Sequence, residues 1–237
     1  MLFLFLGGLI YHARAGIAPF APRRLSGATF RKVRRDALKM SGYQVAFTVS
    51  SQTDMILIGI FLGSAAAAPF GIAHRVFSLM VTMGATLNQA QWPAMAKADA
   101  AGARDAYLPL FRRTLILVPL GAASVAVTIA LLYQPLIELW LGETVATDPW
   151  ILWGMVVWVL IATAANTCAS LLRARNETSF LMRAMGAMAG VNLVLTLILL
   201  PILGPAGAIW GSVIGYCSAV LLPYLWKLRH DILGDRA

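Results

Sequence analysis

The chain has 237 residues, of which 59% are hydrophobic and 12% are charged, and its mean hydropathy is +0.76. Soluble domains contain about 25% charged and about 45–50% apolar residues, and one soluble core of this length cannot hide so much apolar surface. The long apolar runs exclude a disordered chain, and two cysteines are too few for a disulfide scaffold. The class that remains is an integral membrane protein.

The first twenty residues contain a short apolar run, 2–11, which is about half as long as a membrane-spanning helix requires. We interpret residues 1–20 as the end of a truncated transmembrane helix, so that Met1 is an internal residue of a longer protein or a trimmed start. A signal peptide is the alternative, because Ala13-Arg14-Ala15 imitates a cleavage site. It is disfavoured because the run lacks a basic segment before it.

Residues 21–42 form a basic segment that we predict to be a cytoplasmic linker ending in a helix on the membrane surface. Lysine and arginine near a bilayer are attracted to anionic lipid headgroups, by about 1 kcal/mol each. We therefore expect membrane lipid as the partner of this segment. Nucleic acid is not expected, because the segment is single, short and next to the membrane.

Six apolar stretches follow that are each close to the roughly 20 residues needed to span a bilayer. We predict an all-α, polytopic membrane helix bundle: a six-helix lobe over residues 43–226, followed by a cytoplasmic tail over 227–237. The predicted spans are 43–63, 69–92, 114–134, 150–172, 181–203 and 206–226.

The distribution of charge predicts the orientation of these spans. Of the 19 lysine and arginine residues, all except Arg75 fall in the terminal segments, in the loops after the second and fourth spans, or at the start of the fifth. The loop after the third span instead carries Glu138, Glu143 and Asp148. Basic residues accumulate on the cytoplasmic side of membrane proteins, so both ends of the lobe are predicted to be cytoplasmic.

Small residues recur at every fourth position in the sixth span, at Gly207, Gly211, Gly215 and Ala219. This spacing allows another helix to approach closely. Two pairs with the same spacing, Gly186 with Gly190 and Gly59 with Gly63, predict similar packing in the fifth and first spans.

Two fully charged residues lie well within predicted spans, Asp54 in the first and Arg75 in the second. A charge near the centre of a membrane helix costs roughly 2.5–3.5 kcal/mol on insertion scales, so each should face protein or water. Their predicted depths differ by roughly 5 Å at 1.5 Å per residue, which disfavours a direct salt bridge. Two alternatives stay open for Arg75, namely a shared aqueous cavity with Asp54 and snorkelling to the outer headgroups.

Neighbouring polar residues extend this candidate site. Gln52 belongs to the polar run that contains Asp54, and His74 precedes Arg75. The three histidines are scattered and the two cysteines lack metal-ligand spacing. We therefore expect no metal site, no cofactor and no catalytic residues.

Four motifs resemble segments of the polysaccharide and O-antigen flippases of the Wzx type. They are Gln52-Thr53-Asp54 running to Gly63, Pro69-Phe70-Gly71 running to Arg75, Pro93-Ala94-Met95-Ala96-Lys97, and Asn192-Leu193 with the segment 200–208. They occur in the order found in the second lobe of that family, which belongs to the multidrug/oligosaccharidyl-lipid/polysaccharide exporter superfamily. The resemblance covers residues 36–226.

The resemblance implies a non-enzymatic flippase half that moves a lipid-linked oligosaccharide, such as an O-antigen precursor of lipopolysaccharide, across the bacterial inner membrane. Two six-helix lobes enclose the cavity in that superfamily, so the implied partner is a missing N-terminal lobe or a second copy of the chain. It also implies that Arg75 binds the lipid diphosphate. With it we expect Asp54, His74 and Gln52 to form the substrate-binding site.

Three alternatives remain at this stage. A cation-coupled multidrug exporter of the same superfamily would use Asp54 as its ion or proton site. A membrane-embedded glycosyltransferase or polymerase is disfavoured, because the outer loop over residues 134–149 is short. The third alternative is a non-functional gene fragment.

Overall fold

The computed structural model describes residues 27–233. The chain divides into two units, residues 1–38 and 39–237, and the contacts given below are all within the second unit. The predicted helix end over residues 1–20 lies outside the described residues.

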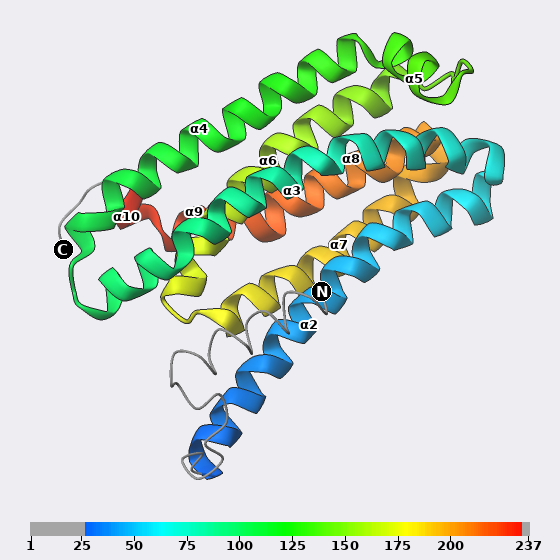
Figure 1. The fold of residues 1–237 in the computed structure, drawn as a ribbon. Helices are drawn as coiled ribbons and strands as arrows, with labels where there is room; N and C mark the ends of the chain where they lie inside the picture. The colour runs from blue at the N-terminus through cyan, green and yellow to red at the C-terminus, as the bar shows by residue number, and fades with distance from the viewer. Residues whose placement is uncertain (1–26, 234–237) are drawn as a thin grey trace, which may run out of the picture. The chain divides into compact units, whose positions relative to one another are not determined.

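Every described element is helical (Figure 1). The helices are α2 (Gly27–Leu62), α3 (Ser64–Ala100), α4 (Arg104–Leu131), α5 (Tyr133–Leu141), α6 (Pro149–Ala174), α7 (Thr178–Leu203), α8 (Pro205–Tyr216), a π-helical turn η2 (Cys217–Leu221), α9 (Leu222–Lys227) and α10 (Arg229–Leu233). The all-α bundle predicted from hydropathy is confirmed.

Five helices within residues 27–233 are long and apolar enough to cross a membrane. They contain the predicted second, fourth, fifth and sixth spans and most of the third. The last of them runs without a break through α8, η2 and α9, over Pro205–Lys227. The predicted first span, 43–63, is helical up to Leu62, where α2 ends, and its Gln52–Leu62 part is a shorter apolar helical segment. The chain is therefore a multi-pass membrane protein.

The predicted end of the third span and the predicted outer loop after it need correction. The third span does not continue to residue 134, because α4 ends at Leu131. A separate short helix, α5, follows it, in the segment that we expected to be only an outer loop, and it ends at Gly142 in the left-handed conformation. Continuous apolar composition across Leu131, Leu132 and Tyr133 conceals this break in the sequence.

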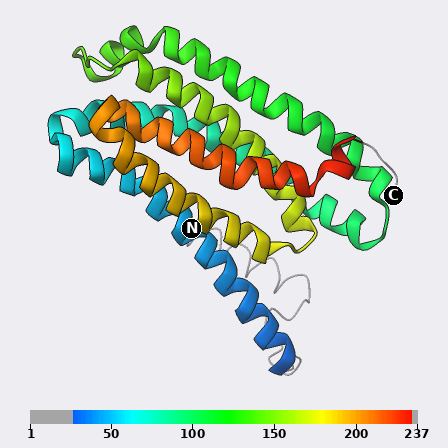
Figure 2. The same cartoon turned by 180° about the vertical axis from the view of Figure 1, so that it is seen from behind.

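Helix α6 forms the centre of the bundle. It packs against α3, α4 and α8, and Figures 1 and 2 both show it between α4 and α8. In its most apolar window 72% of the residues are buried, against 17% in α4 and 22% in α7. Asp148 caps its first turn by accepting a hydrogen bond from the backbone N–H of Trp150, and Pro149 follows at the first helical position, where its missing N–H costs nothing.

Close packing of α8 against α7 follows from the glycines predicted for this role. Added Cβ atoms at Gly207, Gly211 and Gly215 would meet the backbone of α7 at Leu199, Thr196 and Asn192. Gly204, at φ +58°, makes the tight turn between the two helices, a conformation that glycine adopts without steric cost. By contrast, an added Cβ at Gly59, Gly186 or Gly190 meets nothing within 4 Å, so the packing predicted from those pairs is not found within the described part of the chain.

Candidate functional site

The carboxylate of Asp54 lies at the centre of a buried polar cluster between three helices. Asp54 on α2 is 5% exposed. Its Oδ1 accepts hydrogen bonds from Asn192 Nδ2 at 3.0 Å and from Thr196 Oγ1 at 3.1 Å, both on α7. Its Oδ2 lies 2.6 Å from the hydroxyl of Ser212 on α8. We call these four residues the Asp54 cluster.

The glycine stripe of α8 positions this cluster. Gly211 precedes Ser212, and an added Cβ there would lie 3.1 Å from both the backbone nitrogen and the hydroxyl of Thr196. The absence of a side chain thus lets α8 come close enough for Ser212 to reach Asp54. Asn192 and Thr196 are four residues apart, so both fall on the same face of α7.

All the partners of Asp54 in these contacts are neutral. A buried carboxylate without a cation is costly in a membrane, because its charge is compensated only by dipoles. Ser212 Oγ also lies 3.0 Å from Asn192 Oδ1, yet a hydroxyl has one proton to donate. If Asp54 carries a proton, it donates to Ser212, and Ser212 donates to Asn192. If Asp54 is ionised, a bound cation would supply the missing positive charge. The geometry is therefore suited to exchanging a proton or a cation.

Arg75 occupies a different environment. Its side chain is exposed on α3, and none of the salt bridges formed by the described side chains includes it. The side chains of Asp54 and Arg75 are not paired with each other, in agreement with the expectation from their depths. A guanidinium carries five donors arranged to bind the oxygens of a phosphate, so an exposed, unpaired arginine on a membrane helix can bind an anion.

The other two predicted site residues, His74 and Gln52, lie in environments that differ from those of Asp54 and Arg75. The ring of His74 stacks on Phe70, with centroids 6.2 Å apart, and is tilted against Trp158 of α6 at 5.2 Å. His74 therefore packs α3 against α6. Gln52 is exposed on α2, two residues before the buried Asp54 and about 200° away around the helix. None of the hydrogen bonds and salt bridges given for the described part of the chain joins two of these four side chains.

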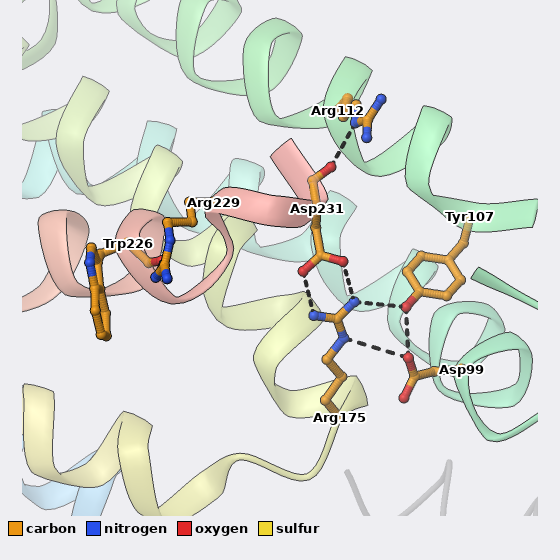
Figure 3. A network of polar contacts seen from close by, with 7 residues as sticks. All are labelled: Asp99, Tyr107, Arg112, Arg175, Trp226, Arg229 and Asp231. Carbon is orange, nitrogen blue, oxygen red and sulfur yellow. Dashed lines mark hydrogen bonds and ion pairs between the residues drawn. The ribbon is translucent and has the colours of Figure 1, made fainter. Parts of the chain in front are cut away.

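A second polar cluster lies at the end of the bundle that is predicted to be cytoplasmic. We call it the Arg175 network (Figure 3). Arg175 follows α6 and donates to both oxygens of Asp231 on α10, at 2.6 and 2.8 Å. It also lies 3.5 Å from Asp99 and donates to the Tyr107 hydroxyl at 3.2 Å. Tyr107 in turn donates to Asp99 at 2.7 Å. Arg112 donates to the backbone carbonyl of Asp231 at 2.7 Å.

This network holds the C-terminal helix against the ends of α3, α4 and α6. The hydrogen bonds that Arg175 donates to the Asp231 carboxylate raise the pKa of Arg175 above its ordinary value; burial opposes this rise, and the hydrogen bond to Tyr107 adds to it. Its charge is therefore fixed, and its carboxylate partners are compensated. The arrangement is a structural clamp.

A cavity of about 300 Å³ opens at the other end of the bundle. It is lined by Asp148, Trp150, Leu203, Ala206 and Trp210, and the two tryptophan rings meet edge to face at 6.4 Å. Tryptophan is enriched where a membrane meets water. This preference accounts for Trp150 and Trp210 at the end of the bundle, so the two rings are not evidence of a ligand site.

Sequence reasoning identified Asp54 and Arg75 but missed the residues that surround Asp54. Thr196 and Ser212 are polar positions within apolar spans, which was the available signal. Asn192 appeared only as part of a family motif. The Arg175 network was missed entirely, because its members come from α3, α4, α10 and the segment after α6, which only the fold brings together.

Comparison with known proteins shows the family to which the chain belongs. Residues 7–147 match the family model described as polysaccharide biosynthesis protein, and the chain belongs to that family. No curated protein matches the chain. The matched region begins earlier and ends sooner than the resemblance noted over residues 36–226, so this match does not extend over α6 and the helices that follow it.

The fold is similar to that of a solved transporter. The crystal structure of the Vibrio cholerae MATE transporter VcmN in its bent form superposes with a TM-score of 0.69 at 20% sequence identity. The superposition covers 83% of this chain and 46% of the transporter, so the chain spans about half the length of that protein. At this identity the similarity establishes the fold alone.

Proposed function

We propose that the chain forms one half of a non-enzymatic transporter that moves a lipid-linked oligosaccharide across the bacterial inner membrane, with both ends of the lobe in the cytoplasm. The family supports a role in polysaccharide biosynthesis. The fold, which corresponds to about half of a MATE transporter, supports a second lobe or a second copy as partner. Transporters of this design rock two halves about a site near the bilayer midplane.

The observation that carries this proposal is the exposed Arg75 on a spanning helix. A charge at such a position is costly unless it faces protein or water, and no acidic side chain in the described chain neutralises it. In the proposal Arg75 binds the diphosphate of the lipid carrier, and Gln52 contacts the sugars from α2. His74 fixes α3 against α6 and so positions Arg75.

Asp54 has a separate task in this scheme. Its cluster gains or loses a proton or a cation as the two halves rock, which couples transport to an ion gradient. Because Asp54 contacts α7 and α8, a change in its charge alters how these helices pack with α2. Conformation and ion binding are thereby linked.

The test of the proposal is Arg75→Ala in the full protein, expressed from its own locus. We expect surface polysaccharide to be lost while the amount of protein in the membrane stays normal. The matched control is Arg113→Ala, an exposed arginine near the start of α4, which should leave polysaccharide unchanged. Unchanged polysaccharide in the Arg75→Ala strain would refute the diphosphate role.

One observation favours a second candidate function, a cation-coupled multidrug exporter. The Asp54 cluster supplies an ion or proton site without requiring an anionic substrate. This function predicts drug resistance that depends on Asp54 and no change in glycan display. Susceptibility to cationic drugs, measured beside surface polysaccharide in the same Asp54→Asn strain, separates the two.

A further inference from the structure

The exposed surface of α3 carries a continuous polar stripe. Arg75, Ser78, Thr82, Thr86 and Gln89 are spaced three or four residues apart, so they lie on one face of the helix, within about 80° at 100° per residue. From the first to the last they cover about 21 Å, a large part of the roughly 30 Å hydrocarbon thickness. The buried residues Phe77, Val81, Gly84 and Asn88 lie on another face, centred about 130° away around the helix.

An apolar line runs beside this stripe on the same helix. Leu79, Met83 and Leu87 are 58%, 63% and 56% exposed. Thr82, Thr86 and Gln89 are exposed as well, and Ser78 is half-buried. The outer surface of α3 is thus divided lengthwise into an apolar line suited to hydrocarbon and a polar stripe suited to water or a polar ligand. The exposed surface of α7 has no such division beyond Arg183 in its second turn, since its large exposed side chains from residue 191 onward, including Val194, Ile198 and Ile202, are apolar.

The hydroxyl groups of the stripe share one hydrogen-bonding pattern. Ser78 donates to the carbonyl of Arg75 at 2.8 Å, Thr82 to that of Ser78 at 2.9 Å, and Thr86 to that of Thr82 at 3.0 Å. Each hydroxyl proton is therefore directed back to the helix, and the oxygen lone pairs remain as acceptors. Threonines four residues apart repeat this acceptor about every 6 Å along the helix.

These features define the ligand chemistry that the stripe suits. Regularly spaced acceptors bind a molecule rich in hydroxyl donors, and the unpaired Arg75 at one end binds an anion. A sugar chain attached to a phosphate has both properties. A hydrophobic drug has neither.

We infer that the α3 stripe is the lane along which the sugars of a phosphate-linked glycan pass, with the phosphate at Arg75. This inference rests on the proposed function and extends it from one binding residue to a path. Thr82 and Thr86 are then specificity-determining residues that contact sugar hydroxyls. The Leu79, Met83 and Leu87 line lies outside the path.

Site-directed labelling tests this division of the helix. In a background carrying Cys168→Ala and Cys217→Ala, single cysteines are introduced by Ser78→Cys, Thr82→Cys and Thr86→Cys. The matched controls, on the same turns, are Leu79→Cys, Met83→Cys and Leu87→Cys. Membranes are then treated with a membrane-impermeant maleimide, with and without a polyprenyl diphosphate that carries a short sugar chain, and with the same lipid without sugars.

We expect the three stripe variants to react at least ten-fold faster than their neighbours. The sugar-bearing lipid should slow the reaction at Thr82→Cys and Thr86→Cys, whereas the sugar-free lipid should slow it only at Ser78→Cys, next to Arg75. Equal reaction rates for the stripe variants and the apolar-line controls would overturn the proposed glycan path, because the stripe would then face lipid or pack against the other half of the transporter. Fast labelling that neither lipid slows would overturn the glycan as its occupant.

The experiments distinguish an error in the proposed glycan path along α3 from an error in the proposed function. If Arg75→Ala abolishes surface polysaccharide while the stripe does not react, only the lane is wrong. If the stripe reacts and a cationic drug, but not the glycan lipid, slows the reaction, both the lane's ligand and the proposed substrate are wrong.

Discussion

The Asp54 cluster and the Arg175 network differ in how the charge of a carboxylate is compensated. In the network, Asp231 and Asp99 lie against a guanidinium, with bidentate contacts of 2.6 and 2.8 Å to Asp231. In the cluster, Asp54 is 5% exposed and its hydrogen bonds come from an amide and two hydroxyls. One arrangement compensates its charge permanently and the other does not.

The difference separates a structural from a functional role. A compensated ion pair gains nothing from a mobile ion, so the Arg175 network stabilises the packing of α10 and the ends of α3, α4 and α6. An uncompensated carboxylate within the membrane is stabilised by binding a proton or cation, and in the proposed scheme this binding changes how α2 packs against α7 and α8. Perturbed charges inside membranes mark functional positions for this reason.

The largest expected effect comes from Asp54→Asn, which keeps the shape of the side chain and removes its ability to ionise. We expect surface polysaccharide to be abolished, because the cluster is then fixed in its neutral state, while protein abundance stays normal. The control is Glu138→Gln on the exposed face of α5, which should have no effect. Normal polysaccharide in the Asp54→Asn strain would remove Asp54 from the mechanism.

Gly207→Ala should give the largest loss of stability. The added methyl group overlaps the backbone of Leu199, which cannot move aside as a side chain would, so α7 and α8 must separate. We expect about 3 kcal/mol of destabilisation, the upper end for overpacking, measured by thermal unfolding in detergent. Gly186→Ala, where an added Cβ meets nothing within 4 Å, is the matched control and should be neutral or stabilising. Equal effects would mean that α8 does not approach α7 as described.

Arg175→Met should lower stability without abolishing transport. It removes the charged hydrogen bonds to Asp231, and we expect a loss of about 2 kcal/mol, with faster proteolysis of the C-terminal segment. Surface polysaccharide at a permissive temperature should remain near normal. Loss of polysaccharide with unchanged stability would show that the comparison drawn above assigns the two regions wrongly.

The smallest effect is expected from Lys227→Met. Lys227 lies 3.0 Å from Glu177, with side chains 33% and 41% exposed, and over the ring of Phe180 at 4.7 Å. Exposed pairs of this kind contribute at most about 1 kcal/mol, and the methionine retains the contact with the ring. Thermal unfolding should therefore shift only slightly; a loss as large as that of Arg175→Met would mean that exposed pairs also hold the bundle.

The sequence was sufficient for features that depend on composition along one helix. Apolar runs located five long spans, and the four-residue spacing of Gly207, Gly211 and Gly215 predicted the close approach of α8. The same spacing at Gly186 and Gly190 predicted packing that the described residues do not show. Spacing reports which residues share a face, but not what lies opposite that face.

Features that depend on distant residues could not be predicted. Asp54 is 138, 142 and 158 residues from Asn192, Thr196 and Ser212, and only the packing of three helices brings them together. Arg175, which follows α6, is 56 residues from Asp231 on α10. The break between α4 and α5 was hidden for another reason, since both sides of it are apolar.

The most direct test of the central claim is transport by the purified full protein in liposomes. The assay follows a fluorescent oligosaccharide on a polyprenyl diphosphate as it reaches the opposite leaflet, with a proton gradient and a Na⁺ gradient imposed in turn. We predict that one of the two gradients drives movement by the native protein, and that neither does so for Asp54→Asn. Movement at the same rate in protein-free liposomes, or identical rates for the native and Asp54→Asn proteins, would contradict the account.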